Sequence, residues 1–469
     1  MIVMPEFAED EDVKAYFPYY IIQIALTALV WITIIGLCLF YTLRLHVMPV
    51  ALGGFIFGVI FLAVPEMWKW QPWQMITCLV VNMLLNLWSW YLIGRFGLGN
   101  LDGIKFTGNY MVGHKTIYAK KFGSPVSVWY PIDQGPYKGI ARKRYMEGGK
   151  HALENLKGIG KGGAWLARND AADTGPFMVK HILSIVTQAI PDAQLANDFM
   201  SGENKLIPIL FSHGILANRE DYQLRGMELA SNGYIVFMCD HLDGLGRYVK
   251  KEGDEVVKIE KDFIHPSDCW PIGEPDNEKN AAVWYKDVHQ RRISEISEII
   301  TDMEEEMFMS NRLHFGKAQM DLDKIVMCGH SLGGATALGV GEQEDRVKLV
   351  MSMDPHGNIL KDTIGSWTKI HKKPLQVQWT EQMSNIEPRN LPIHGPGIYD
   401  KMENPDTFEN LMLYKTDHMH QGDMMAIMPL ELNSLMLDAR FKEEKMFFDP
   451  RKRELDLYFT HLQMRFMRK

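Results

Sequence analysis

The first hundred residues are dominated by three long apolar stretches, at roughly 19–43, 47–64 and 73–93. None of the three contains Asp, Glu, Lys or Arg. A helix needs about 20 apolar residues to cross the hydrocarbon core of a bilayer, so each stretch is long enough. Buried core helices of a soluble protein are the alternative, but three uncharged runs in succession disfavour it. The pattern therefore predicts three transmembrane helices within residues 19–96.

The pattern changes at about residue 105, where short apolar runs begin to alternate with amphipathic segments such as 283–309. Short continuous apolar runs are typical of strands that are buried on both faces of a parallel sheet. The sequence therefore predicts an α/β fold with a mainly parallel sheet over residues 105–469. An acidic segment, 1–18, and the membrane region, 19–96, precede it. The expected strands lie at 126–132, 206–214, 234–241, 324–331, 347–354, 374–381 and 410–418.

Three other segments allow more than one interpretation. Residues 138–161 are basic and rich in glycine, which indicates either a solvated loop or a contact with anionic lipid headgroups. Residues 177–190 have an amphipathic helical pattern that fits a cap over the site, a helix on the membrane or packing against the sheet. The basic and apolar tail, 451–469, is open to the same interpretations.

Charge and cysteine content narrow the functional classes. The net charge of -8 argues against a nucleic-acid partner. Five scattered cysteines form no disulfide framework and fit a reducing compartment. Among the charges that flank the apolar stretches, Arg44, Arg95 and Lys105 lie on one side and Lys14 and Lys69 on the other. The positive-inside rule then predicts a multi-pass membrane protein whose large C-terminal part faces the cytosol or the mitochondrial matrix.

The segment KIVMCGHSLGGATA, 324–337, carries the clearest chemical signal. It places Ser331 between Gly329 and Gly333, where a strand pattern meets a helix pattern. Gly-x-Ser-x-Gly in this context is a nucleophile elbow, a strained turn that projects the serine hydroxyl above the edge of the sheet. The bare motif also arises by chance, so the strand before it and the helix after it are what favour a catalytic serine.

A nucleophilic serine needs a base and an orienting acid, in the chain order Ser, Asp or Glu, His. Asp354 ends the next apolar run and is the candidate acid, although a turn residue is its ordinary role. His418 and His420 both follow the last apolar run, and spacing alone does not choose between them. Two backbone N–H groups should bind the oxyanion. They are expected at Leu332 and near Ile215, in the turn after the second strand.

The histidine-rich stretch DHMHQGD, 417–423, raises the alternative of a metal site. It lacks the partners and the spacing of a known zinc motif. We therefore expect a serine hydrolase that uses no metal and no other cofactor.

Taken with their spacing, these motifs resemble the platelet-activating factor acetylhydrolases, the serine-dependent, calcium-independent group of phospholipases A2. The resemblance runs from about Val112 to about Asp423, and GHSxGGAT is its most specific element. The similar segments are VGHKTIYAKKFGSPVSVWYPID, LFSHGILANREDY, YIVFMCDHLDG and DKIVMCGHSLGGATA.

The resemblance implies an α/β-hydrolase fold and a set of site residues. Ser331 falls on the nucleophile and Asp354 on the acid. The base falls on His420, because the family's catalytic histidine is followed by Gln, as in His420–Gln421. The oxyanion donors fall on the backbone of Ile215 and of Leu332, which stands where the family usually has Phe.

The resemblance also implies a reaction, the hydrolysis of short or oxidised sn-2 acyl esters of phospholipids through an acyl-enzyme. With the apolar N-terminal region, the expectation becomes a membrane-anchored serine esterase whose partners are a phospholipid or another ester and the membrane lipid. The alternative is a non-catalytic or vestigially active hydrolase-fold subunit of a larger membrane protein complex. An intact set of catalytic residues shows only that the chemistry is possible, so both functions stay open.

Overall fold

The structure, a computed structural model, describes eight helical positions between 73 and 88 and most of 101–147, 185–258, 275–356, 373–383, 402–423 and 455–468. The chain divides into two compact units. One comprises Met1–Gly99 with Pro429–Glu431, and the other comprises Asn100–Met428 with Leu432–Lys469. The division falls between the predicted membrane region and the predicted hydrolase domain, and each unit is described by itself.

In the first unit, nearly all of the three predicted transmembrane helices lies outside the described residues. The eight described positions belong to the third stretch, where the Thr77 hydroxyl donates to the Trp73 carbonyl, as in a helix. Their apolar side chains are exposed, for example Trp73 at 64% and Leu84 at 55%. Within the part of the chain that the structure describes, no helix combines the length and the apolar character needed to cross a membrane.

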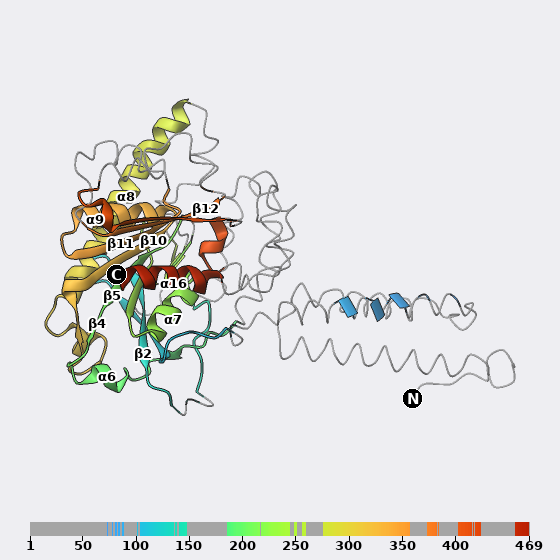
Figure 1. The fold of residues 1–469 in the computed structure, drawn as a ribbon, viewed down its shortest axis with the longest axis horizontal. Helices are drawn as coiled ribbons and strands as arrows, with labels where there is room; N and C mark the ends of the chain where they lie inside the picture. Colours follow the sequence, from blue (N-terminus) through green and yellow to red (C-terminus); the bar gives the residue numbers. More distant parts are fainter. Residues whose placement is uncertain are drawn as a thin grey trace. The chain divides into compact units, whose positions relative to one another are not determined.

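The second unit is built on a nine-stranded sheet with the order β13-β12-β11-β10-β5-β6-β2-β1-β3 (Figure 1). The six strands from β13 to β6 are parallel, whereas β2 pairs antiparallel with both β6 and β1. The strands at the predicted positions are β2 (Pro125–Ile132), β5 (Pro208–Ser212), β6 (Ile235–Cys239), β10 (Ile325–His330), β11 (Val347–Met353), β12 (Leu375–Thr380) and β13 (Phe408–Leu413). The strands β1 (Met111–Tyr118) and β3 (Ile190–Pro191) complete the sheet, with β3 at its edge. This is the predicted α/β-hydrolase-like fold with a mostly parallel sheet.

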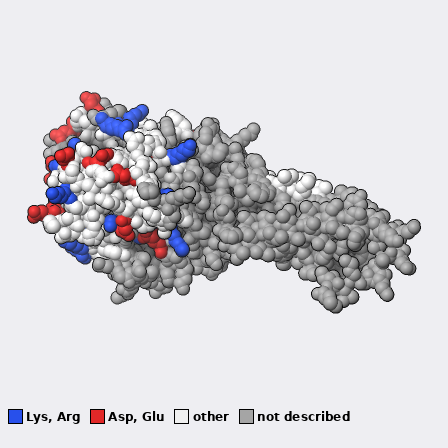
Figure 2. Space-filling model, turned by 90° about the horizontal axis from the view of Figure 1, so that it is seen from below, with Lys and Arg blue, Asp and Glu red and all other residues white. Residues whose placement is uncertain are grey.

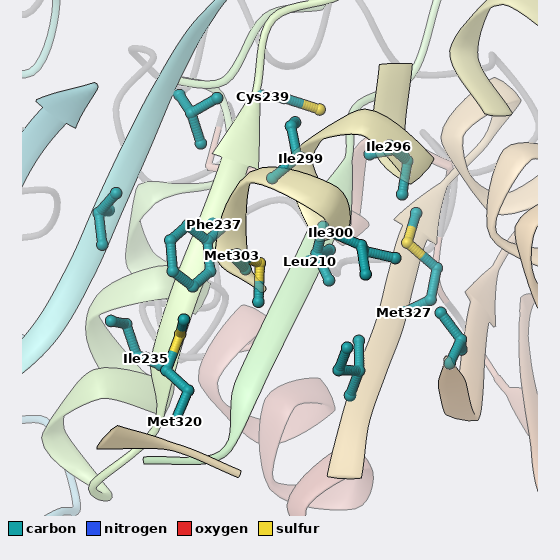
Figure 3. Close-up of a cluster of buried hydrophobic side chains, with 14 of the residues drawn as sticks. Leu210, Ile235, Phe237, Cys239, Ile296, Ile299, Ile300, Met303, Met320 and Met327 are labelled. Carbon is teal, nitrogen blue, oxygen red and sulfur yellow. The ribbon is translucent and has the colours of Figure 1, made fainter. Parts of the chain in front are cut away.

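Helices cover both faces of this sheet, and alternating strand residues supply the two cores (Figure 1). Leu210, Phe237 and Met327 pack toward α8 (Pro275–Met303) and α9 (Leu332–Gln343), as Figure 3 shows for residues of α8. Phe211 and Met238 point the other way, toward α7 (Gln223–Ser231) and α16 (Leu455–Met467). Each fully buried side chain of this size contributes about 1.5–3 kcal/mol, which explains why the central strands are apolar on both faces.

Two of the segments that were open to interpretation pack into this unit. The described part of 177–190 is not the predicted helix, because Ile190–Pro191 forms β3 beside Gly113 and His114 of β1. The rest of that prediction, 177–184, lies outside the described residues. In the C-terminal tail, Met464 and Phe466 of α16 are buried in the core next to α7.

The basic segment 138–161 is described only in part, and one of its lysines is not available to a lipid headgroup. Lys143 is 3% exposed, and its Nζ lies 3.4 Å from a carboxylate oxygen of Glu220 and 3.0 Å from the amide oxygen of Gln223. A buried ammonium group needs such partners. Lys143 therefore holds the start of α7 in place.

Charged side chains on the surface of this unit are mixed in sign. On the described part of the face shown in Figure 2, Lys and Arg are interspersed with Asp and Glu. Arg346 illustrates the pairing, with its guanidinium nitrogens 2.7 Å from Glu304 and 2.6 Å from Glu344. Interspersed charges differ from the basic stripe that marks a nucleic-acid interface.

Asp221, just before α7, is a buried carboxyl group with an altered acidity. One of its oxygens accepts a hydrogen bond of 2.8 Å from the Asn218 N–H. The other oxygen is buried without a hydrogen-bond partner among the described residues. Burial is the main cause that raises the pKa of Asp221 to about 7, and the neighbouring charges of Glu220 and Asp240 add to it.

We expect Asp221 to make the unfolding free energy fall as pH rises from about 4 to about 7. Over that range the unfolded chain loses the proton while the folded protein keeps it, so the folded state binds more protons and the slope is negative. Asp221→Asn should remove part of this fall, so that the variant gains on the order of 1–3 kcal/mol relative to wild type between pH 5 and pH 8. Denaturant titrations at the two pH values measure it. The exposed Asp323→Asn is the control, and parallel behaviour of wild type and Asp221→Asn would contradict the assignment.

Candidate active site

Ser331 occupies the tight turn between β10 and α9, with φ 58° and ψ -120°. Positive φ is costly for a residue with a side chain, and such strain is typical of a nucleophile elbow. A Cβ atom on Gly329 would lie 1.9 Å from the carbonyl oxygen of Gly333. A Cβ atom on Gly333 would lie 2.0 Å from the carbonyl oxygen of Ser212. The backbone packing of the turn thus excludes any side chain at either glycine.

Two backbone hydrogen bonds join the elbow to the end of β11 and to the residues that follow this strand. The Ser331 N–H donates to the carbonyl of Met353 at 2.9 Å, and the Ser331 carbonyl accepts from the His356 N–H at 3.0 Å. Met353 ends β11, so these bonds hold Ser331 at the carboxyl edge of the parallel sheet. That edge is where ligands bind in open α/β sheets.

Asp354 follows β11 directly and lies at the same edge, fully buried and with φ 41°. Its carboxylate accepts hydrogen bonds from the Thr380 N–H at 2.6 Å and from the Thr380 hydroxyl at 2.7 Å. The Nδ1 atom of His418 lies 3.1 Å from one of the carboxylate oxygens. These hydrogen bonds fix the orientation of the carboxylate, which suits an acid that orients a histidine ring.

The histidine at Asp354 is His418, whereas the family resemblance predicted His420. This contact favours His418 as the base, and the choice of His420 remains a prediction from the resemblance. His418 begins the short 3-10 helix His418–Gln421, and His420 lies two residues further along it, 3% exposed. A 3-10 helix has three residues per turn, so residues two apart project in different directions.

His330, the residue before the nucleophile, packs between the elbow and this histidine. Its ring centroid lies 4.4 Å from that of His418, and its Nδ1 lies 2.8 Å from the hydroxyl oxygen of Tyr222. Burial is the main cause that lowers the pKa of His330, and the nearby His418 adds to it. His330 is therefore a neutral packing residue beside the elbow.

The turn predicted to bind the oxyanion lies against the elbow. A Cβ atom on Gly214 would lie 3.2 Å from the Cβ atom of Ser331. The ring of His213 forms a 2.8 Å hydrogen bond from Nδ1 to the Gly214 carbonyl. Because C=O and N–H point in opposite directions in a trans peptide unit, this bond also fixes the direction of the Ile215 N–H. The second predicted donor, the Leu332 N–H, opens α9 directly after Ser331.

A buried ion pair supports this turn, and the sequence did not point to it. Arg292 lies in α8, and Asp243 precedes that helix in the chain. Arg292 donates to the His213 carbonyl at 2.6 Å and pairs with Asp243 at 2.5 Å. Both charged side chains are buried, so each needs the other. Their sequence distance from the turn is large, and only the fold reveals their role.

Another serine, histidine and carboxylate are joined by hydrogen bonds in the same region. The Ser212 hydroxyl is 2.7 Å from Nε2 of His241, and Nδ1 of His241 is 2.7 Å from a carboxylate oxygen of Glu295. Burial raises the pKa of Glu295 to about 7 and, with the charge of Arg292 adding to it, lowers the pKa of His241. All three side chains are at most 2% exposed. A substrate cannot reach a serine that is so deeply buried. These three side chains therefore have a structural role in supporting the oxyanion turn.

Among the described residues, one set of three side chains lies close enough to hold a metal ion. One ligand atom each from His330, Asp354 and His418 lie within 4.8 Å of one another. The Nδ1 atom of His330 already bonds Tyr222, and the carboxylate of Asp354 already binds Thr380 and His418. These bonds occupy Nδ1 of His330 and both carboxylate oxygens of Asp354.

The geometry agrees with what comparisons with known proteins find. A sequence model of the family described as "Platelet-activating factor acetylhydrolase, isoform II" matches residues 169–379, which include Ser331 and Asp354. Platelet-activating factor acetylhydrolase of Canis lupus familiaris is 29% identical over 202 residues, 41% of this chain and 44% of that protein. The Bos taurus protein of the same name is 27% identical over 279 residues, 56% of this chain and 57% of that protein.

The matched regions thus span about half the length of these relatives. Among solved structures, a ferulic acid esterase from Streptomyces cinnamoneus aligns over 74% of this chain and 91% of its own. Its sequence identity is 16% and its TM-score is 0.40.

Proposed function

Since the chain is related to the platelet-activating factor acetylhydrolases, we propose that it is a membrane-anchored serine esterase acting on short or oxidised sn-2 acyl esters of phospholipids. The observation that carries the proposal is the Asp354–His418 contact at the sheet edge where the elbow presents Ser331. An acid bonded to Nδ1 of a histidine, beside an elbow serine, is the arrangement that acyl transfer requires.

In the proposed reaction, His418 takes the proton of the Ser331 hydroxyl, and the serine oxygen attacks the ester carbonyl. Asp354 holds Nδ1–H of His418, which leaves Nε2 to accept that proton. The backbone N–H groups of Ile215 and Leu332 bind the oxyanion, the alcohol leaves with a proton from His418, and water then releases the acid. Apart from the substrate and water, these steps use groups of the protein alone.

The membrane anchor is the part of the proposal that the N-terminal sequence supports. Three uncharged apolar stretches lie within 19–96. Exposed apolar side chains at helical positions such as Val81, Leu84 and Trp88 suit a lipid environment, because they would be costly in water. A tethered enzyme meets a lipid substrate at high local concentration. From the flanking charges, we propose that the hydrolase unit faces the cytosol or the mitochondrial matrix.

The test uses membranes from cells that express the full chain. We expect a fluorophosphonate probe to label the protein, and the membranes to release sn-2 acetate from an acetylated phosphatidylcholine faster than a long acyl chain. Alkaline carbonate extraction should leave the protein in the membrane pellet. Absence of labelling together with copurification in a fixed complex would instead favour the non-catalytic membrane subunit. Labelling with equal release of long and short chains would overturn the substrate class alone.

A further inference from the structure

Tyr222 links the two halves of the site through one hydroxyl group. It precedes α7 directly, and its side chain is 4% exposed. The Gly214 N–H donates to this hydroxyl at 3.2 Å, and Nδ1 of His330 lies 2.8 Å from it. Gly214 belongs to the oxyanion turn, and His330 adjoins the nucleophile. No motif or spacing singles out this tyrosine within the segment ANREDY.

The direction of each hydrogen bond follows from the chemistry of the partners. The Gly214 N–H can only donate, so the tyrosine oxygen accepts there and its own proton points to His330. Burial raises the pKa of Tyr222, so the hydroxyl keeps that proton, and burial lowers the pKa of His330, so the ring stays neutral and accepts it. A tyrosine hydroxyl thus satisfies both groups at once.

Both ends of this link lead to groups that take part in the proposed reaction. At one end, the peptide unit between His213 and Gly214 is held twice, because Arg292 bonds its carbonyl and Tyr222 bonds its N–H. The next peptide unit carries the Ile215 N–H. At the other end, the ring of His330 stacks against His418 with 4.4 Å between the ring centroids. A shift of the hydroxyl would therefore disturb the oxyanion donor and the base together.

We propose that Tyr222 is a positioning residue of ester hydrolysis, whose hydroxyl fixes the oxyanion turn and the His330–His418 pair relative to each other. The inference rests on the proposed function. It differs from a purely structural role because it predicts an effect on the transition state. A misplacement of about 1 Å in such a group lowers a rate by about 100-fold without weakening the binding of substrate.

The experiment compares two variants that each delete one buried hydroxyl. Tyr222→Phe removes the link. Tyr130→Phe removes a hydroxyl that donates to the Ala193 carbonyl at 2.7 Å in the core, and it is the matched control. Both are measured with a short-chain p-nitrophenyl ester, with the labelling rate of a fluorophosphonate and by thermal unfolding, using the full-length protein in detergent.

For Tyr222→Phe we expect a fall in kcat of about 10- to 100-fold, a KM within about twofold of wild type, and a parallel fall in labelling rate. Tyr130→Phe should keep the wild-type kcat even if its melting temperature falls as much as that of Tyr222→Phe. Equal kcat in the two variants, or a loss in Tyr222→Phe that appears in KM alone, would overturn the inference.

A measurement that needs no activity separates this inference from the proposed function. Hydrogen exchange of the Gly214 amide should accelerate by at least about tenfold in Tyr222→Phe and stay near wild type in Tyr130→Phe, because the amide loses its acceptor in the first variant only. Unchanged exchange would overturn the positioning role in an active or an inactive protein. An inactive wild type that still shows the exchange difference would refute the esterase while keeping the link.

Discussion

Replacing Ser331 with alanine is expected to lower ester hydrolysis by at least about a thousandfold and to abolish labelling by a fluorophosphonate. The reason is that the hydroxyl at the strained elbow is the group that forms the acyl-enzyme, and alanine has no nucleophile to replace it. The change is small and the side chain is 5% exposed, so the fold should be kept. The measurement is the initial rate on an acetylated phosphatidylcholine, with the melting temperature recorded in parallel.

The buried set of Ser212, His241 and Glu295 offers a matched control. Ser212 has the same kind of bond to a histidine, 2.7 Å to His241, but it is fully buried. The Ser212→Ala variant should therefore still be labelled at Ser331, because the probe does not reach the buried Ser212 hydroxyl in the wild-type protein. Hydrolysis that survives in Ser331→Ala at the wild-type rate would contradict the proposed nucleophile. Loss of labelling in Ser212→Ala in a folded protein would contradict its assignment as a support.

The sheet was predictable from sequence because its strands are buried on both faces. A parallel central strand is typically a continuous apolar run, and such runs mark β5, β6 and β10. The elbow was predictable for a local reason. Gly329 approaches the carbonyl oxygen of Gly333 so closely that no other residue fits, and both glycines lie within two positions of Ser331. Requirements that act within a few residues leave a readable pattern.

The supports of the site were not predictable, because their partners are distant in sequence. Arg292 lies 79 positions from the His213 carbonyl that it bonds, and Tyr222 lies 108 positions from His330. Thr380, which donates two hydrogen bonds to Asp354, is the last residue of an ordinary strand. No periodicity or motif distinguishes such residues, since each is chosen by the packing of the finished fold.

In the described part of 177–190, residues 185–190, the predicted helix is absent for a different reason. An amphipathic pattern describes which residues are apolar, and the same residues also suit an edge strand. Pro191 lacks an N–H group and is tolerated at a sheet edge, where Ile190–Pro191 pairs with β1. The periodicity was too short to distinguish the two outcomes.

Replacing His418 with alanine is expected to lower kcat by about a thousandfold or more, while His420→Ala should keep kcat within about tenfold of wild type. His418 holds the 3.1 Å contact to Asp354, so its loss removes the proton acceptor. His420 is buried in the same 3-10 helix, and its truncation should instead lower the melting temperature through the cavity that it leaves. The two histidines lie two positions apart in the same short helix, so each variant serves as the control of the other. Steady-state rates and melting temperatures, measured together on a short-chain ester, separate the two effects. The opposite ranking of kcat would restore the His–Gln pair as the mark of the base and would show that the Asp354–His418 contact is a structural bond.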